Sequence, residues 1–515
     1  MKRLIYCLSG MCIVLLTSYD LLAQEENNPL LYSYQAVMFG DQNTSHDPAT
    51  LVMPGTAYAS GFSSYLENPA SAAFFDKSFG SFGLAFRSVD ESVRFIDRHT
   101  SMDDNQTGIS NAGFVYRFPA EQGSLVIGAG YSQHSFYNRA LSISGRNENS
   151  SITDQFKIPG SPYGDIAFST FAIDSGDEIG DWDESIFRVG FDQYGDFLGI
   201  NQEGEITERG RAGDYSAFMA TEFLQNIMVG ASVGIRSGRY HYGRTFLEID
   251  EPNFYDGTVI DSNDDGQPDT NIDNILMRDD IRSNFTSFVA KVGTIFRVNP
   301  NLHLGASYTF PTRMTVNEEF DARIVSEFNN GVSFEDDLAT EFTYRITTPA
   351  RISFGAALVD IGGLTISGSA EYVDHSRTRI DFDADLFEDE RIENNLISDT
   401  YRDVWNLRGG AALALSDQVT LRGGYGIRPS KFRNIDFTQE QFSGGIGFKI
   451  SENTRLDISA QYTMWDEPQS SVYELGVYDY SPLPDNTPSI STSSEFASRD
   501  VNRLQVMASI RFNIK

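Results

Sequence analysis

The sequence has only two cysteines, and both lie close to its start. Cys7 and Cys12 fall within residues 1–23, where two basic residues precede an apolar run and Ala23 offers a cleavage point. This arrangement is typical of an export signal, so we expect residues 1–23 to be a signal peptide. The mature chain would then contain no cysteine, which excludes structural disulfides, thiolate metal sites and cysteine nucleophiles.

Long apolar runs and positive charge are also scarce. No run of about 18 apolar residues follows the signal segment, which excludes membrane-spanning helices. The 39 Lys and Arg are outnumbered by 72 Asp and Glu, giving a formal charge of -33, which argues against nucleic acid as a partner. In contrast, 44 Gly, 38 Phe and 24 Tyr are present, enough for close strand packing and for the aromatic girdles of a membrane barrel.

The dominant pattern is a repeat. Two segments in which apolar and polar residues alternate are joined by a short turn, and a long polar stretch follows them. The last segment, 502–513, is the clearest, because apolar residues from Leu504 to Phe512 alternate with polar ones from Gln505 to Arg511. One face of such a strand can meet lipid and the other a wet lumen. We therefore predict an all-β fold, a transmembrane antiparallel β-barrel in the outer membrane of a bacterium.

The alternation predicts about fourteen strands, an even number that places both ends of the barrel on one side of the membrane. Their expected ranges are 81–88, 110–118, 124–136, 213–223, 227–243, 284–298, 301–314, 341–359, 364–380, 402–415, 418–428, 441–450, 454–465 and 502–513. Short turns are expected at 225–226, 299–301, 360–363, 416–417 and 451–453, and long outer loops at 89–109, 137–212, 244–283, 315–340, 381–401, 429–440 and 466–501. A further hairpin around 186–191 would raise the count to about sixteen.

Residues 24–80 do not follow the alternation. They combine small residues and prolines with aromatic side chains such as Tyr32, Phe62 and Phe74, an apolar content too high for a solvated leader. We expect this segment to be a plug, or hatch, inside the barrel, and residues 81–515 to form the barrel with long extracellular loops.

Several short motifs, taken in order, carry a family resemblance. Asn68-Pro69-Ala70 precedes the first expected strand, and the later motifs are Val292–Phe296, Leu304–Tyr308, Thr348–Arg351, Glu371–Asp374, Trp405–Asn406 and Leu421–Tyr425. In their order and spacing, the chain resembles the FadL/TodX family of outer-membrane transporters for hydrophobic compounds over nearly its whole mature length. The resemblance implies passive uptake of a hydrophobic small molecule, such as a long-chain fatty acid, through a lumenal pocket gated by the hatch. It also implies a sideways exit near the third strand, here about residues 128–138.

The expected lumen contains candidate ligand-binding residues. Arg351, Arg408 and Arg422 fall on inward-facing positions, with Glu371 nearby. A lumenal arginine can hold a carboxylate through a bidentate, charge-assisted pair. The alternative is an internal ladder of salt bridges, because barrel interiors are normally polar.

The hatch motif has two interpretations. Asn68 can bond its own backbone, Pro69 fixes φ, and Ala70 follows as a small residue. Movement of this turn would open the pocket, whereas a purely structural role would make it a turn that specifies the fold.

An acidic run in an expected outer loop is similar to a calcium loop. Oxygen ligands stand at relative positions one, three, five and nine, with glycine at six: Asp261, Asn263, Asp265, Asp269 and Gly266. This spacing suits Ca²⁺, although the twelfth position holds Ile272 instead of Glu. The alternative is an ordinary acidic turn.

Catalytic residues are not indicated. Asp374, His375 and Ser376 are the residue types of a triad, but on a strand His375 points away from the other two. We therefore expect no enzyme and no required cofactor.

Two other functions remain open besides transport. In the first, a plugged barrel binds another envelope or secretion protein through its acidic loops, 137–212 and 466–501. In the second, the chain is a water-filled porin, against which the apolar N-terminal segment argues. In every case outer-membrane lipid surrounds the barrel.

Overall fold

The computed structural model describes residues 32–514 with internal gaps. The gaps are residues 43–46, 121, 159–160, 176–182, 189–196, 252, 256–258, 264, 268, 383–385 and 480–488. The expected signal peptide, 1–23, lies outside the described residues, as does part of the segment 186–191. Within the described residues, no helix is long and apolar enough to cross a bilayer.

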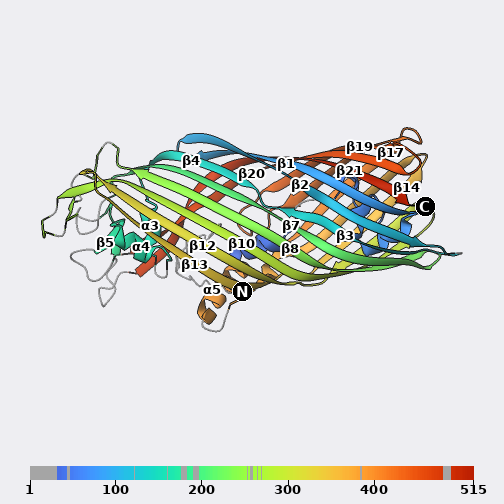
Figure 1. Cartoon of the computed structure of the whole chain (residues 1–515), viewed down its shortest axis with the longest axis horizontal. Coiled ribbons are helices and arrows are strands. Elements are labelled where there is room, and N and C mark those ends of the chain that lie inside the picture. Colours follow the sequence, from blue (N-terminus) through green and yellow to red (C-terminus); the bar gives the residue numbers. More distant parts are fainter. Residues whose placement is uncertain are drawn as a thin grey trace, which may run out of the picture.

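The chain forms a closed antiparallel barrel of fourteen strands, which confirms the predicted fold class and count (Figure 1). Each strand pairs with its neighbour in the chain, and the last pairs with the first. The ring runs β1(Ser78–Phe95), β2(Arg98–Phe118), β3(Leu125–Phe136), β7(Ile200–Leu224), β8(Ile227–Ile249), β10(Thr270–Arg297), β11(Leu302–Thr309), β14(Arg351–Ile361), β15(Leu364–Asp374), β17(Asp403–Ala414), β18(Val419–Pro429), β19(Thr438–Lys449), β20(Thr454–Asp479) and β21(Ser489–Ile514).

Further strands continue the wall beyond this ring. They are β4(Arg139–Asn147), β12(Arg313–Phe328), β13(Ser333–Thr347) and β16(Arg379–Asp381). Three strands expected to be continuous, 301–314, 341–359 and 364–380, are interrupted, at residues 310–312, 348–350 and 375–378. Pro311 and Pro349 explain the first two breaks, because proline has no N–H to donate to the ladder. In the third, the short helix η3(His375–Arg377) follows β15.

The short turns are confirmed, whereas most of the expected long loops are strand. β1 and β2 together cover most of 89–109, and β7, β8 and β10 extend far into 137–212 and 244–283. The barrel wall therefore projects well beyond the membrane on the side opposite the short turns.

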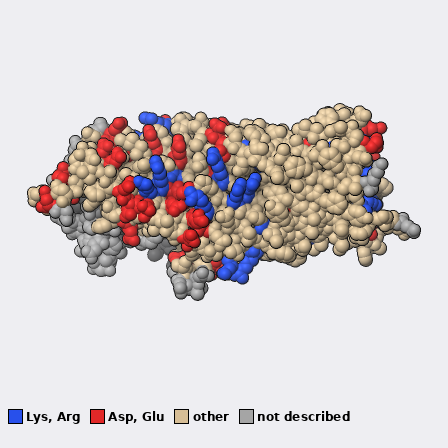
Figure 2. Space-filling model, in the orientation of Figure 1, with Lys and Arg blue, Asp and Glu red and all other residues tan. Residues whose placement is uncertain are grey.

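The projecting wall reverses the alternation of the membrane part, which is why the sequence pattern did not reveal it. In the membrane part of β10, Phe288, Val292 and Phe296 are exposed, so the apolar face meets lipid. Farther out on the same strand, Met277 and Ile281 are buried, so the apolar face lines the interior. Figure 2 shows the consequence, a band without charge at one end and charged side chains over the projecting part. A closed barrel with such a band is the architecture of a bacterial outer-membrane protein.

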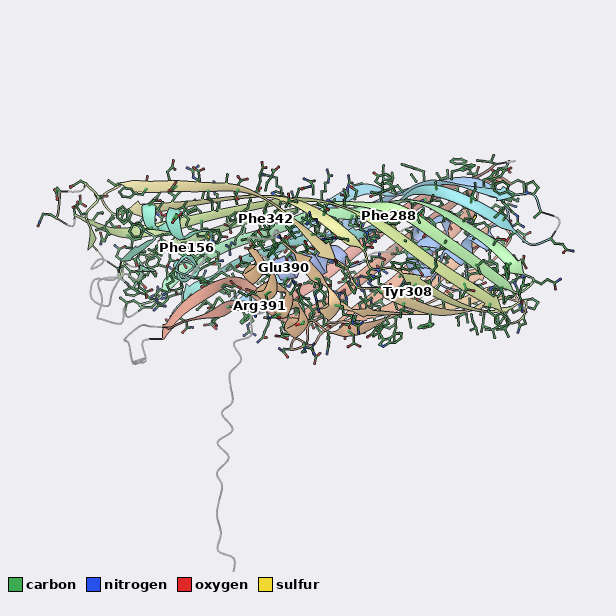
Figure 3. The ribbon with its side chains drawn as sticks, turned by 90° about the horizontal axis from the view of Figure 1, so that it is seen from below. Phe156, Phe288, Tyr308, Phe342, Glu390 and Arg391 are labelled. Atoms are coloured by element: carbon green, nitrogen blue, oxygen red, sulfur yellow. The ribbon has the colours of Figure 1, made fainter. Side chains whose placement is uncertain are left out.

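Small elements lie in and around the barrel. Toward the short-turn end lie α2(Pro48–Val52), η1(Phe62–Leu66) and η2(Pro69–Phe74), and around the outer end lie α3(Thr153–Phe156), α4(Gly164–Ser169), β5(Ile173–Ser175), β6(Asp183–Ser185) and β9(Val259–Ile260). Near the middle, α1(Tyr32–Gly40) packs on α5(Phe387–Thr400), which also contacts η3(His375–Arg377) (Figure 1). The largest apolar cluster joins α1 to the inner face of the projecting wall and to α3. In Figure 3, Phe156 of α3 lies near the outer end, whereas Phe288 and Tyr308 lie in the membrane part.

Candidate functional site

The N-terminal segment, described here as residues 32–42 and 47–75, contacts the inner faces of the barrel strands. Four buried wall serines donate hydrogen bonds to its backbone carbonyls. Their donor–acceptor distances are 2.7 Å for Ser135 Oγ to Asp41 O, 2.7 Å for Ser459 Oγ to Pro48 O, 3.1 Å for Ser367 Oγ to Pro54 O, and 2.6 Å for Ser307 Oγ to Glu67 O. Single polar contacts spread along the segment thus add to the apolar packing of its side chains on the wall.

Asn68 is the point where the segment is held most firmly. Its Oδ1 accepts a hydrogen bond from Ala70 N at 3.0 Å, and Pro69 occupies the first position of η2, where proline fits best. Its Nδ2 donates to Thr56 O at 2.7 Å, and to Thr294 O and Ala306 O in β10 and β11 at 3.1 and 3.3 Å. Asn68 thus both caps its own turn and ties that turn to the wall.

Wall glycines make room for this close approach. A Cβ added at Gly293 would overlap Asn68 Oδ1, and one added at Gly410 would overlap Val52 O. Any side chain at these two positions would push the segment away from the wall, so glycine is required by contact and not by φ.

The three predicted lumenal arginines face the interior, and each makes an ion pair. Arg351 contacts Glu371 at 3.1 Å and Asp41 at 3.4 Å, and Arg408 contacts Glu67 at 2.9 Å. Arg422 contacts Asp457 at 2.7 Å. Arg351 and Arg408 therefore join the N-terminal segment to the wall, and a ligand carboxylate would have to displace an internal acid. Their ligand role stays a prediction.

Two neighbouring cavities of the lumen share Asn406 and Arg428. The lower cavity, about 90 Å³, is lined mostly by polar side chains, including Glu67, Glu371 and Arg408. The upper cavity, about 130 Å³, is lined by both aromatic and cationic side chains. The lower cavity thus contains two of the predicted residues, Arg408 and Glu371, whereas Arg351 and Arg422 line neither cavity.

The upper cavity carries more positive than negative side chains. Its aromatic lining includes Tyr34, Phe136, Tyr137, Phe432, Phe437 and Trp465; its cations are Arg139, Arg428, Lys431, Arg499 and Arg503, and its acids Asp41, Glu208 and Glu467. Arg139, Arg428 and Arg499 pair with those acids.

Among the described residues, Lys431 and Arg503 make no ion pair, and acids such as Asp41 and Glu91 act on them only through space. Arg503 donates to Asn138 O at 3.0 Å and lies 4.8 Å from the Trp465 ring centre, and its Nε has no partner. The upper cavity therefore offers two cations beside an aromatic wall.

The barrel wall is interrupted beside the upper cavity. The ladder between β2 and β3 ends at Asn111 and Ser132, and β4 pairs with β7 but not with β2. Among the described residues, individual hydrogen bonds and no ladder bridge this stretch: Asp104 accepts from Asn138 and from Arg209, and Thr100 Oγ1 donates to Ser142 O. The gap falls within and just above residues 128–138, where the family resemblance places an exit, and that role stays a prediction.

A Ser–His–Asp contact exists in the wall at this gap. His134 Nε2 lies 3.0 Å from Asp214 Oδ1, and its Nδ1 lies 2.7 Å from Ser135 Oγ. The Ser135 hydroxyl, however, donates to Asp41 O at 2.7 Å, so it is engaged in holding the N-terminal segment. At Asp374-His375-Ser376 the serine donates to Asp374 at 2.6 Å, whereas His375 lines the upper cavity.

The acidic run in the outer part forms a tight turn. Asp261 Oδ1 accepts hydrogen bonds from Asn263 N and Asp265 N, both at 3.2 Å, and Asp269 Oδ1 accepts one from Ser262 N at 2.9 Å. Gly266 has φ +81°, which this turn requires. The described residues contain no cluster of three or more His, Cys, Asp or Glu side chains placed to hold a metal ion. Calcium binding stays a prediction.

No family model matches the chain, and no curated protein sequence matches it. Similar solved structures include the Pseudomonas putida toluene transporter TodX, with 12% identity, a TM-score of 0.48, and coverage of 92% of this chain and 99% of that one. A Pseudomonas aeruginosa FadL homologue has 12% identity, a TM-score of 0.49, and coverage of 92% and 98%. The Ralstonia pickettii toluene transporter TbuX has 14% identity, a TM-score of 0.46, and coverage of 92% and 100%. At these values the FadL/TodX family stays a resemblance, and the ligand has to be argued from the cavities themselves.

Proposed function

We propose that this protein is a passive outer-membrane conduit for hydrophobic small molecules that carry an acidic group, long-chain fatty acids among them. The observation that carries the proposal is the upper cavity, where Lys431 and Arg503, which make no ion pair with the described residues, line the same space as aromatic side chains. A carboxylate gains most from a cation that no internal acid already neutralises. The aromatic side offers the apolar surface that the rest of the ligand needs.

The size of the cavities indicates that a long ligand enters only with movement. A protein cavity of about 150 Å³ holds a benzene-sized molecule, and the upper cavity measures about 130 Å³. An acyl chain therefore needs the N-terminal segment to shift, which is the hatch role proposed for Asn68-Pro69-Ala70. The segment is suited to this because its polar contacts with the wall, made by serine hydroxyls, Asn68 and three ion pairs, can each break separately.

The exit proposed is the gap between β2 and β4. Phe136, Tyr137 and Asn138 line the upper cavity and also belong to the interrupted stretch of wall. A ligand leaving there breaks side-chain contacts of Asp104 and no backbone ladder. We propose no catalytic step, because the Ser135 hydroxyl is committed to Asp41 O.

The test is binding of radiolabelled palmitate to the detergent-purified protein. The double variant K431Q/R503Q is expected to weaken binding by about tenfold or more, the usual scale for losing charged hydrogen bonds. R422Q is the matched control, because Arg422 pairs with Asp457 and lines neither cavity.

Other outcomes count against the proposal. Loss of palmitate in R408Q, with K431Q/R503Q unaffected, moves the head-group site to the lower cavity. Retention of a stoichiometric envelope protein, with no palmitate bound by any form, favours the scaffold function instead.

A further inference from the structure

An apolar row marks the upper edge of the membrane band on one side of the barrel. Tyr131, Tyr215, Ile235 and Phe288 are consecutive cross-strand neighbours on β3, β7, β8 and β10. The last three are 58–64% exposed, and the Tyr131 and Tyr215 rings lie 4.9 Å apart. Such a row is where acyl chains end and head groups begin.

Basic side chains stand directly above this row. The next outward-facing row is small and polar, with Gly213, Ser237 and Thr286. Above it, Arg211 lies directly opposite Arg239. Figure 2 shows basic side chains gathered where the uncharged band ends.

A second basic row follows, made by Arg209, His241 and Arg282, and these side chains are neutralised by acids. Arg209 contacts Asp104 at 2.6 Å. Asp280 lies 2.5 Å from both His241 and Arg282. This row therefore carries little free positive charge.

Arg211 and Arg239 differ from that row because neither has an acidic partner among the described residues. Like charges directly opposite each other on a sheet are destabilising. On a chain with a formal charge of -33, two facing arginines without a counter-charge are best accounted for by an external anion.

The height of the pair fits a head group. Four residues of strand separate Arg211 from Tyr215, about 13 Å along the strand and about 10 Å along the membrane normal once strand tilt is included. An arginine side chain that leans back toward the band reaches the layer of head groups. Guanidinium groups bind phosphate in a bidentate way.

We propose that Arg211 and Arg239 bind a phosphate of an outer-leaflet lipid whose acyl chains pack on Tyr131, Tyr215, Ile235 and Phe288. The site lies on the outer surface of β7 and β8, separate from the lumenal cavities, and does not depend on the transport function.

The probe is bisphosphorylated lipid A, followed by native mass spectrometry of the detergent-purified protein. Wild-type protein is expected to retain the lipid, and R211Q/R239Q to retain it about thirtyfold more weakly, the effect of removing two arginines from an anionic lipid surface. Dephosphorylated lipid A is expected to be lost from both forms. Excess inorganic phosphate is expected not to displace the lipid, because phosphate alone lacks the acyl contacts.

The matched control is R278Q/R323Q. Arg278 and Arg323 are also opposed on the projecting wall. Arg278 lies ten residues beyond Phe288 along β10, so this pair is out of reach of lipid.

Equal retention by R211Q/R239Q and wild type, or equal retention of the dephosphorylated lipid, overturns the proposal. Displacement by inorganic phosphate makes the pair a plain phosphate site and overturns the lipid assignment. Because both positions face outward, the variants keep the barrel, which heat-modifiable migration in gels checks.

Discussion

Asn68 shows how one residue joins local and long-range structure. Its carboxamide oxygen caps η2, and its amide group reaches carbonyls of two strands more than 200 residues away in sequence. It is fully buried, so removing the side chain leaves buried backbone groups without partners, and such groups cost more than the bond itself contributes.

The substitution N68A tests this role. Loss of the cap costs about 1 kcal/mol, and orphaned buried groups add about 1–3 kcal/mol. We expect the amides of residues 62–75 to exchange with deuterium faster, by the factor that corresponds to this loss of free energy. N301A is the matched control, because Asn301 also donates to backbone carbonyls but in an exposed turn. Unchanged exchange in N68A would show that the segment is held elsewhere.

Residue-level prediction from sequence succeeded where the information was local. The bond from Asn68 to its own turn follows from the Asn-Pro sequence, and the inward direction of Arg351 follows from alternation. Their partners across the lumen, such as Thr294 and Asp41, depend on which strands face the segment. The sequence could have indicated Arg503, because it stands two residues before the lumenal Gln505 on the same strand and therefore faces the same side. It contains no such indication for Lys431, which lies just after β18.

At the scale of elements, the strands that continue from the membrane into the water beyond it explain why the sequence did not predict the projecting wall. β10 presents apolar side chains outward in the membrane and inward beyond it. A search for apolar residues on the outward face recognises only the first part, so the projecting wall was predicted as loop. The short turns were predicted because their Asn, Asp, Gly and Pro residues determine local conformation.

The outer end of the barrel is filled by residues 147–158 and 161–173, held by Glu248 of β8. Its carboxylate accepts hydrogen bonds from Ile152 N at 2.8 Å and Gln202 Nε2 at 2.7 Å, and from Ser151 Oγ. Burial raises the pKa of Glu248 to about 7. The native state therefore binds a proton that the unfolded segment releases between about pH 4.5 and 7.

This proton makes the packing of the outer segment depend on pH. Because the pKa is raised in the native state, stability is greatest below about pH 4.5 and falls as the pH rises to 7, by about 3 kcal/mol at most. We expect deuterium exchange in residues 150–156, corrected for intrinsic rates, to show more opening at pH 8 than at pH 5. The isosteric E248Q, which stays neutral, should lose most of that difference. A difference that persists in E248Q would assign it to another group.

At the scale of the whole molecule, the lumen is blocked in both directions along its axis. The N-terminal segment occupies the membrane part, and residues around α3 occupy the outer end. The wall gap between β2 and β4 lies between these two obstructions and beside the upper cavity. Transport through such a barrel requires a sideways step, unless both segments leave together.

Cross-linking the gap tests that step. The sequence has no cysteine beyond Cys12, so the pair D104C/N138C can be joined by a short reducible reagent across residues whose side chains are in contact. We expect uptake of palmitate into cells to stop on cross-linking and to return on reduction, because a closed gap leaves no exit. The control pair E205C/T245C joins β7 and β8, which already share a backbone ladder there, and should leave uptake unchanged. Uptake that continues through the closed gap would mean that the ligand leaves along the axis, past a displaced N-terminal segment.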